Sequence, residues 1–198
     1  SKNTLTGKAQ NDTVTLAGDN VMSKVAPVPP SGQPASGKLP PLRHGDRLTR
    51  EEFHRRYEAM PELKKAELVE GVVYVYPVNF EWHSGPDFGL IAWLGYYQWH
   101  TPGIGGGSNA TVILDDWNEP QPDACMIIRP ERGGQGRFTS EGYLVGAPEL
   151  AAEVSASSAR LDLGAKKDVY RRHGVKEYIV WRVLDKAMEM VVETVLHH

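Results

Sequence analysis

Pro148-Glu-Leu-Ala-Ala-Glu-Val-Ser155 is the stretch that decides the fold class of this chain. Its short apolar run lies between a proline and a serine-rich turn, which is typical of a buried strand. Glu153 interrupts the apolar run, and an unpaired buried carboxylate costs several kcal/mol. The stretch therefore predicts an interior strand whose carboxylate needs a cationic partner.

Short strands alternate with helices over the rest of the chain from Leu48 onward. Strands are predicted at 72–76, 110–114, 124–128, 149–154, 178–184 and 188–195, and helices at 49–60, 86–99 and 162–173. The last helix ends at Gly174, a residue suited to a left-handed cap. The order αβαβββαββ predicts a mixed α/β fold, in which helices flank a central mixed β-sheet.

Three local signals refine this prediction. Thr49 and Glu52 form a capping box, and Pro86 suits the first turn of the next helix. That helix, Phe88–Trp99, is apolar on nearly all sides, which predicts either burial or a contact between subunits. The glycine-rich segment 103–107 lacks the residues of a phosphate-binding loop, and we interpret it as a plain loop.

Composition separates the N-terminal segment from the remainder. Residues 1–45 contain Pro, Gly and Ser at a density that cannot build a core, so we expect a flexible segment followed by one domain at 46–196. The net charge of −3 gives no global basic field that would hold nucleic acid. The single Cys125 fits a reducing compartment and no apolar run is long enough to span a membrane, so we expect a cytoplasmic protein.

Three segments place charged side chains at the edges of apolar elements. They are Gln121-Pro-Asp123, the stretch that contains Glu153, and Asp162-Leu-Gly-Ala-Lys166. Two carboxylates on neighbouring strands can share a hard divalent cation such as Mg²⁺. A nearby lysine can orient water and screen the charge that grows on a phosphate. The pattern is consistent with a phosphodiesterase site.

Each segment also has a purely structural interpretation. Asp162 and Lys166 are four residues apart on one helix face, and such a pair is more often solvated and worth roughly 0.2–0.5 kcal/mol. Asp123 follows a proline, so a turn explains it equally well. Glu153 is equally consistent with a salt bridge to an arginine. Only the combination favours a functional site.

Taken together, these segments resemble the Uma family of restriction-endonuclease-like proteins, a branch of the PD-(D/E)xK nuclease superfamily. The resemblance runs from about Leu48 to Trp181. Gly146-Ala-Pro-Glu-Leu-Ala-Ala-Glu-Val154 is close to the family's Gly-x-Pro-Asp-Leu-Val-Val-Glu-Val. Ala66-Glu-Leu-Val-Glu-Gly71 is similar to its Glu-Leu-Ile-Asp-Gly-Glu segment, and Glu81-Trp-His83 to the start of its histidine-bearing helix.

The resemblance implies a restriction-endonuclease-like core and a metal-dependent nuclease. Asp123 and Glu153 are then the ligands of Mg²⁺ or Mn²⁺, and Lys166 assists the attacking water. Glu67 lies beside them as a further ligand or as a group that positions water. The candidate accessory residues are His83, Asp162 and Tyr170.

Nucleic acid, with double-stranded DNA favoured, is the partner that this family implies. Arg171, Arg172 and Lys167 follow Lys166 along the same helix, and we expect them to contact the phosphate backbone. Cutting both strands of a duplex calls for two sites, which favours a homodimer.

One turn departs from the family pattern. The segment between Glu153 and Asp162 is one residue shorter than usual, and Ser155 stands where the superfamily's lysine follows the acid. The short turn favours an alternative, a non-catalytic nucleic-acid-binding or assembly module that retains the fold. A weaker alternative is a small-molecule metallohydrolase that uses the same side chains.

Overall fold

The computed structural model describes residues 39–192. Most of the predicted flexible segment, residues 1–38, lies outside the described residues. Within them, Leu42 is buried in one cluster with Phe53, and the Gly45 N–H donates to the Val73 carbonyl at 2.8 Å. The packed part of the chain therefore begins before residue 46.

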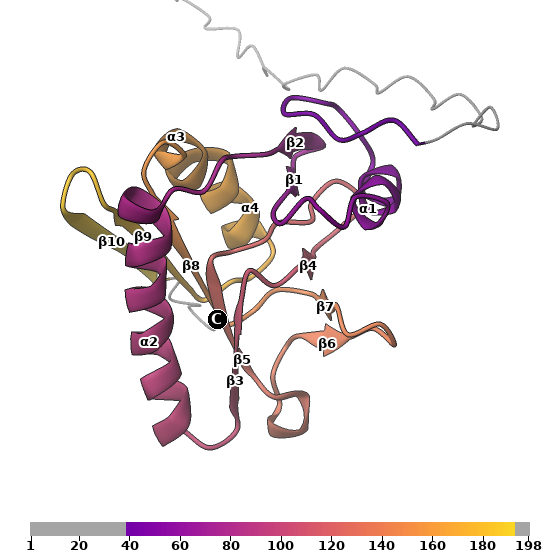
Figure 1. Cartoon of the computed structure of the whole chain (residues 1–198). Helices are drawn as coiled ribbons and strands as arrows, with labels where there is room; N and C mark the ends of the chain where they lie inside the picture. The colour runs from indigo at the N-terminus through magenta and orange to yellow at the C-terminus, as the bar shows by residue number, and fades with distance from the viewer. Residues whose placement is uncertain (1–38, 193–198) are drawn as a thin grey trace, which may run out of the picture. The chain divides into compact units, whose positions relative to one another are not determined.

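Five strands form the central sheet, in the order β10-β9-β8-β5-β3 (Figure 1). The β8–β9 pair is parallel and the other neighbours are antiparallel, so the sheet is mixed, as the element order predicts. β8 contains Glu153 and lies in the middle of the sheet. The five strands are β3 (Ile104–Ser108), β5 (Ala124–Ile128), β8 (Leu150–Ser155), β9 (Glu177–Arg182) and β10 (Ala187–Val192).

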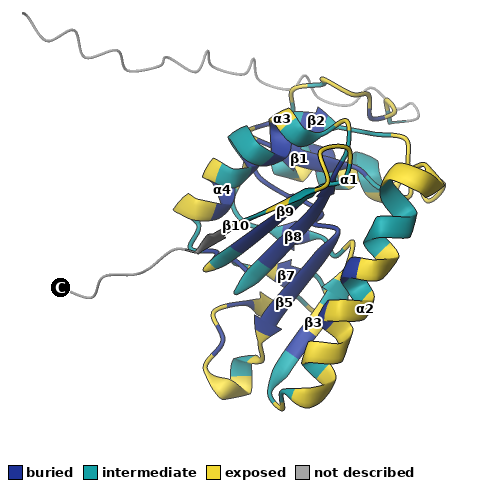
Figure 2. Ribbon diagram, turned by 90° about the vertical axis from the view of Figure 1, so that its left-hand side faces the viewer, coloured by how far each residue is buried: buried dark blue, intermediate teal, exposed yellow. Residues whose placement is uncertain are grey.

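Helices cover opposite faces of this sheet (Figures 1 and 2). On one face, α2 (Gly85–His100) packs its Leu90 and Leu94 in a cluster with Ala152 and Val154 of β8. On the other face, Tyr170 of α4 (Lys167–Arg172) packs in a cluster with Ala151. Because strand side chains alternate between faces, Glu153 projects toward α4 together with Ala151.

A two-stranded ribbon and a first helix hold the start of the domain. β1 (Glu67–Val69) pairs with β2 (Val72–Tyr74) around a tight turn in which Glu70 and Gly71 both have positive φ. Such a turn matches the twist of the two strands. α1 (Arg50–Glu58) begins as predicted, because the Thr49 side chain accepts a hydrogen bond from the Glu52 N–H at 3.4 Å.

A three-stranded sheet lies beside the central one. β4 (Val112–Ile113) is parallel to β7 (Leu144–Val145), and β7 is antiparallel to β6 (Arg137–Phe138). The predicted strands 110–114 and 124–128 thus belong to different sheets. The predicted loop 129–142 contains β6 and the 3₁₀ turn η2 (Pro130–Arg132).

Two helices carry an irregular turn. The π-helical turn η1 (Phe80–Ser84) leads into α2. The predicted helix 162–173 consists of α3 (Ala159–Leu161), the turn η3 (Asp162–Lys166) and α4. Gly164 within η3 has non-helical torsions, φ −108° and ψ −110°, so the helix is kinked there. The predicted stop is confirmed at Gly174, whose φ is +84°.

The interpretation of residues 103–107 as a loop is wrong. Residues 104–107 belong to β3, and Gly106 pairs with Met126 of β5. A Cβ at Gly106 would lie 2.5 Å from Oε1 of Gln98, and one at Gly105 would lie 3.2 Å from Ile127 Cγ1. These glycines let β3 pack closely against Gln98 of α2 and Ile127 of β5, and they do not form a turn.

The predicted apolar helix is confirmed as α2, but it is buried on only one side. Leu90 and Leu94 are inside, whereas Phe88 and Trp99 are 77 % and 87 % exposed. Figure 2 shows much of α2 in the colour of exposed residues. Over residues 39–192, no helix has both the length and the hydropathy that a membrane span requires.

Candidate active site

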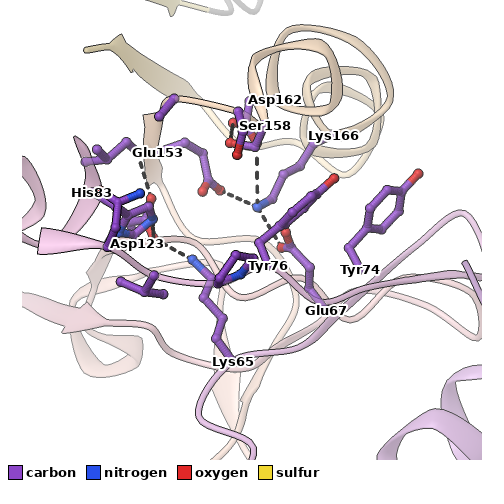
Figure 3. A pocket seen from close by; sticks show the side chains of 16 residues that line it. Lys65, Glu67, Tyr74, Tyr76, His83, Asp123, Glu153, Ser158, Asp162 and Lys166 are labelled. Carbon is purple, nitrogen blue, oxygen red and sulfur yellow. Dashed lines mark hydrogen bonds and ion pairs between the residues drawn. The ribbon is translucent and has the colours of Figure 1, made fainter. Parts of the chain in front are cut away.

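Acidic and basic side chains from four separate segments meet at one small cavity of about 40 Å³ (Figure 3). Glu67 comes from β1, Asp123 directly precedes β5, Glu153 lies in β8, and Asp162 and Lys166 begin and end η3. All five residues are at most 4 % exposed. The structure thus brings together residues that are up to 99 positions apart in the sequence (67 to 166).

Lys166 stands at the centre of this cluster. Its Nζ lies 2.6 Å from Glu67 Oε2, 2.9 Å from Glu153 Oε1 and 4.0 Å from Asp162 Oδ1. Burial alone would lower the pKa of Lys166, but the carboxylates around it raise the pKa well above its ordinary value. Lys166 is therefore held as an ammonium ion at neutral pH. The solvated pair considered for Asp162 and Lys166 is not found, because both are buried.

Glu153 is fully enclosed between this ammonium and an aromatic hydroxyl. Its Oε1 also accepts a hydrogen bond from the Tyr170 hydroxyl at 3.2 Å. Burial raises the pKa of Glu153 well above the ordinary value of a carboxyl, and the nearby Asp123 and Asp162 raise it further against the opposing effect of Lys166. Glu153 is thus the carboxylate of the cluster whose ionised form is least compensated.

Asp123 has the opposite electrostatic state. Its Oδ1 accepts from the Lys65 ammonium and lies 3.3 Å from Nε2 of His83, while its Oδ2 accepts from the Val154 N–H at 2.7 Å. Burial would raise the pKa of Asp123, but His83 and Lys65 outweigh burial and hold the pKa well below its usual range. Asp123 is therefore ionised at neutral pH.

Asp162 lies at the outer side of the cluster. Its Oδ2 accepts from the Ser158 hydroxyl at 2.6 Å, and its backbone carbonyl accepts from the Tyr178 hydroxyl at 2.9 Å. Burial raises the pKa of Asp162 despite the opposing effect of Lys166. These bonds fix the start of η3, and the kink at Gly164 then lets Lys166 point back between Glu67 and Glu153.

The cluster carries more acid than base. Four carboxyl groups line the cavity with two ammonium groups, so the formal charge is two units negative when all four acids are ionised and His83 is neutral. Among the described residues, Oε1 of Glu67 and Oε2 of Glu153 have no hydrogen bond or ion pair. Carboxylate oxygens and a deficit of two positive charges fit a hard divalent cation such as Mg²⁺.

The cavity matches a divalent cation in its charge and in its oxygen donors, but its side chains are not arranged as a preformed metal coordination shell. In the part of the chain that the structure describes, no three acid, cysteine or histidine side chains converge as they would around a metal ion. The ammonium groups of Lys65 and Lys166 instead stand between the carboxylates. Binding a cation would therefore require Lys65 to release Asp123.

Some of the predicted accessory and phosphate-binding residues lie at the acid cluster, and others lie away from it. His83 and Tyr170 reach the cluster, through Asp123 and Glu153 respectively. Arg171 and Arg172, which were expected to contact phosphates, are exposed on α4 and pair with Asp168 at 3.3 Å and with Glu70 at 3.1 Å. Lys167 does not line the cavity either.

Sequence reasoning missed Lys65 as a site residue and treated it as one of several basic pairs. It precedes Glu67 by two positions, and period-two alternation in an extended segment places both on one side. Asp87 was also missed. It lies in the first turn of α2, where burial and the charge of Asp123 raise its pKa to about 6.

The cavity is bordered by aromatic residues of the chain that leaves β2. Tyr74 and Tyr76 stack at 6.1 Å between ring centroids, and both are part of the cavity wall with Val78 and Asn79. Burial and the nearby Glu67 raise the pKa values of both tyrosines, so their hydroxyls stay protonated donors at neutral pH. The segment 74–79 therefore forms a wall that can offer hydrogen bonds to an anionic ligand.

Comparison with known proteins gives a family and a fold. A family model described as "Uma2: Putative restriction endonuclease" matches residues 50–194. A solved structure, that of a putative nuclease belonging to DUF820 from Anabaena variabilis ATCC 29413, superposes with a TM-score of 0.50 at 16 % identity, covering 74 % of this chain and 85 % of that one. At this identity the likeness shows the fold alone. No curated protein matches the chain.

Proposed function

The chain belongs to the Uma2 restriction-endonuclease family, and on this premise we propose that it is a metal-dependent endonuclease that hydrolyses phosphodiester bonds of DNA. Family membership supports a nuclease-like role. The observation that carries the finer proposal is the acid surplus of the cavity, in which four carboxylates face two ammonium groups. Buried carboxylates in excess of their cationic partners carry a desolvation penalty, which a bound cation would offset.

Asp123 and Glu153 are the residues that would hold the metal. A bound Mg²⁺ or Mn²⁺ supplies charge neutralisation at a phosphate oxygen and lowers the pKa of a water molecule. Glu153 suits this role because its ionised form is poorly compensated within the chain. The bond from the Val154 N–H to Asp123 fixes the two acids relative to each other, since Val154 is the neighbour of Glu153.

Lys166 acts in this proposal as a charged donor. Its raised pKa means that it cannot accept a proton from water at neutral pH. It can instead stabilise the negative charge that develops on the phosphoryl oxygens. The proton of the attacking water then passes to a carboxylate, and Glu67, which borders the cavity 2.6 Å from Lys166, is the residue that we assign to this role.

A plasmid-nicking assay in the presence of Mn²⁺ tests the proposal. Wild type should nick the plasmid, and Asp123→Ala should lose the activity because the metal loses its ionised ligand. Asp168→Ala, which removes an exposed acid paired only with Arg171, is the matched control and should nick like wild type. Equal activity of wild type and Asp123→Ala, or no activity in clean wild-type protein, would contradict the proposal.

A non-catalytic nucleic-acid-binding module is the second candidate, and one observation favours it. The ammonium groups of Lys65 and Lys166 already pair with Asp123, Glu67 and Glu153, so the cluster can serve as a closed structural network. Calorimetric titration with Mg²⁺ and Mn²⁺ distinguishes the two candidates. Heat of binding that disappears in Asp123→Asn supports the nuclease, and its absence in wild type supports the module.

A further inference from the structure

β3 is the outermost strand of the central sheet, and one of its two edges has no neighbouring strand among residues 39–192 (Figure 1). Its sequence, Ile-Gly-Gly-Gly-Ser, has no charged residue and no proline, which are the residues that commonly protect an exposed strand edge. Gly106 and Ser108 are exposed. β3 therefore has an unprotected edge that another strand could extend.

The hydrogen bonds of β3 show which of its backbone groups face this free edge. The Asn109 N–H donates to the Asp123 carbonyl at 3.1 Å. In an antiparallel pair, residues that bond to the neighbouring strand alternate with residues that do not, so the odd-numbered residues of β3 bond to β5. The N–H and C=O groups of Gly106 and Ser108 therefore point to the free edge, and within the described chain no backbone group bonds to them.

Cavities open on both faces of the sheet beside this edge, and Gly106 and Gly107 border both of them. One cavity, of about 120 Å³, lies on the face covered by α2, next to Leu94 and Gln98. The other, of about 250 Å³, lies on the opposite face. Because the side chains of a strand alternate between faces, a strand added along β3 would direct them in turn toward the two cavities. The large side chains that line the second cavity are mainly apolar, and they include Ile127, Phe138, Tyr143 and Leu144.

Two arginines stand near the end of β3 that begins at Ile104. Arg129 lines the larger cavity, and Arg132 lies beside Gly103, where an added Cβ would be 3.0 Å from the arginine Cγ. Both arginines are exposed, and neither forms an ion pair with any acid of residues 39–192. Acidic residues on an added strand would find complementary charge at this end.

The free edge matches a polypeptide better than it matches nucleic acid. Open N–H and C=O groups that recur along a strand pair with another extended backbone, which carries the same groups at the same spacing. The backbone of DNA offers phosphate acceptors but no donors for the open carbonyls. The apolar cavity beside the edge also suits a protein side chain, since recognition by strand addition takes its specificity from such pockets.

We propose that β3 is the docking site for an extended segment of another protein, apolar and then acidic in sequence, which joins the sheet as an antiparallel strand. Antiparallel pairing is the more stable kind and repeats the pairing of β3 with β5. Residues opposite Gly106 and Ser108 then face α2, those between them face the larger cavity, and the acids follow beside Ile104. This inference goes beyond the proposed nuclease function and is tested without metal or nucleic acid.

Fluorescence anisotropy of a labelled, amidated peptide, Leu-Thr-Leu-Thr-Leu-Asp-Asp, titrated with the full chain is the experiment. The dissociation constant should be below about 1 mM. N-methylation of both threonines removes the N–H groups that face β3, and it should weaken binding by about 30-fold or more. N-methylation of the two leucines that follow the threonines alters N–H groups that face away, and it should leave binding unchanged.

Substitutions in the protein locate the peptide on this edge. Ser108→Pro removes an outward N–H and retains the bonds to β5, so binding should weaken by about fivefold or more. Ser108→Ala keeps the N–H and is the matched control, which should bind like wild type. Arg129→Gln should weaken binding by about twofold to fivefold, but not the binding of a peptide that ends in two asparagines. The thermal midpoint of each variant shows whether it is folded.

Absence of saturable binding by wild type would overturn the proposal, as would equal weakening by the two kinds of N-methylation. Equal binding by wild type and a folded Ser108→Pro would overturn it as well. If Ser108→Pro does not fold, the two N-methylated peptides still decide. Sedimentation velocity without peptide covers the remaining occupant, because self-association of wild type that Ser108→Pro abolishes would assign the edge to a second copy and overturn the proposal.

Discussion

Two buried ion networks lie on either side of β1, and their difference shows what distinguishes a candidate site from a structural one. In the first, Lys166 and Lys65 pair with an excess of carboxylates around a cavity. In the second, Glu119 pairs with His54 at 2.7 Å and with Arg50 at 3.7 Å and has a completely buried side chain.

The second network connects elements, and His54 within it also pairs with the exposed Glu58 at 3.4 Å. Glu119 exchanges backbone hydrogen bonds with Leu68 of β1 at 2.8 and 3.0 Å, and its side chain holds two residues of α1. Burial raises the pKa of Glu119, with His54 and Arg50 acting against this effect. Burial of a charge is thus common to both networks, whereas four buried carboxylates gathered around one cavity distinguish the first.

Removal of the central cation should have the largest effect. We expect Lys166→Met to lower the free energy of unfolding by about 3–5 kcal/mol, because it leaves Glu67 and Glu153 buried without a partner. Urea denaturation measures this change. The exposed Lys64→Met is the control and should change stability by less than ~0.5 kcal/mol. A similarly small change for Lys166→Met would mean that the acids do not depend on it.

Response to a divalent cation should separate the two networks. With Mg²⁺ at 100 times its dissociation constant, wild type should gain about 2.7 kcal/mol of stability. Asp123→Asn should lose this gain because it removes the ionised ligand, whereas Glu119→Gln should retain it. Thermal denaturation with and without Mg²⁺ gives the comparison. If the gain in stability survives in Asp123→Asn, or is lost in Glu119→Gln, the cation does not bind at the first network as proposed.

The smallest expected effect is a pH dependence at the edge of the first network. The pKa of Asp87 is raised to about 6, mainly by burial and then by Asp123, against the opposing charges of His83 and Lys65. An acid with a raised pKa in the folded state stabilises the protein below its unfolded pKa of about 4, and this contribution is lost as pH rises through 6.

Asp87→Asn measures this contribution. In buffer with a chelator, wild type should lose stability relative to Asp87→Asn between about pH 4 and pH 7, by a small amount because Asp87 is half exposed to solvent. Unfolding by urea at a series of pH values records the difference. Parallel pH curves for the two proteins would show that Asp87 titrates normally.

Much of the fold follows from local signals in the sequence. The cap at Thr49, the Gly174 stop and the alternation of strands and helices are properties of short segments, and the structure confirms them. The strand at residues 104–108 was not predictable in this way. Its glycines allow close contact with Gln98 of α2 and Ile127 of β5, and such contacts between elements cannot be read from the local sequence.

The candidate site was only partly predictable, for the same reason. Glu153 and Asp123 stand out locally as charges in apolar surroundings. Lys65 does not, because its partner Asp123 is 58 residues away and nothing around Lys65 marks it as different from Lys64. The exposure of one side of α2 was also not predictable, because a helix that is apolar on all sides carries no signal for which side packs against the sheet.

The hydrogen bond from the Val154 N–H to Asp123 bears on which sequence changes this protein can accept during evolution. Because it joins a side chain of one strand to the backbone of the next, the spacing of the two acids depends on the alignment of β5 with β8 and not on the connections between them. Insertions in the exposed turn at residues 140–142, between β6 and β7, should therefore be tolerated, whereas a shift of β8 by one residue would turn Glu153 toward α2. The architecture leaves the loops free to diversify while the chemistry stays in place.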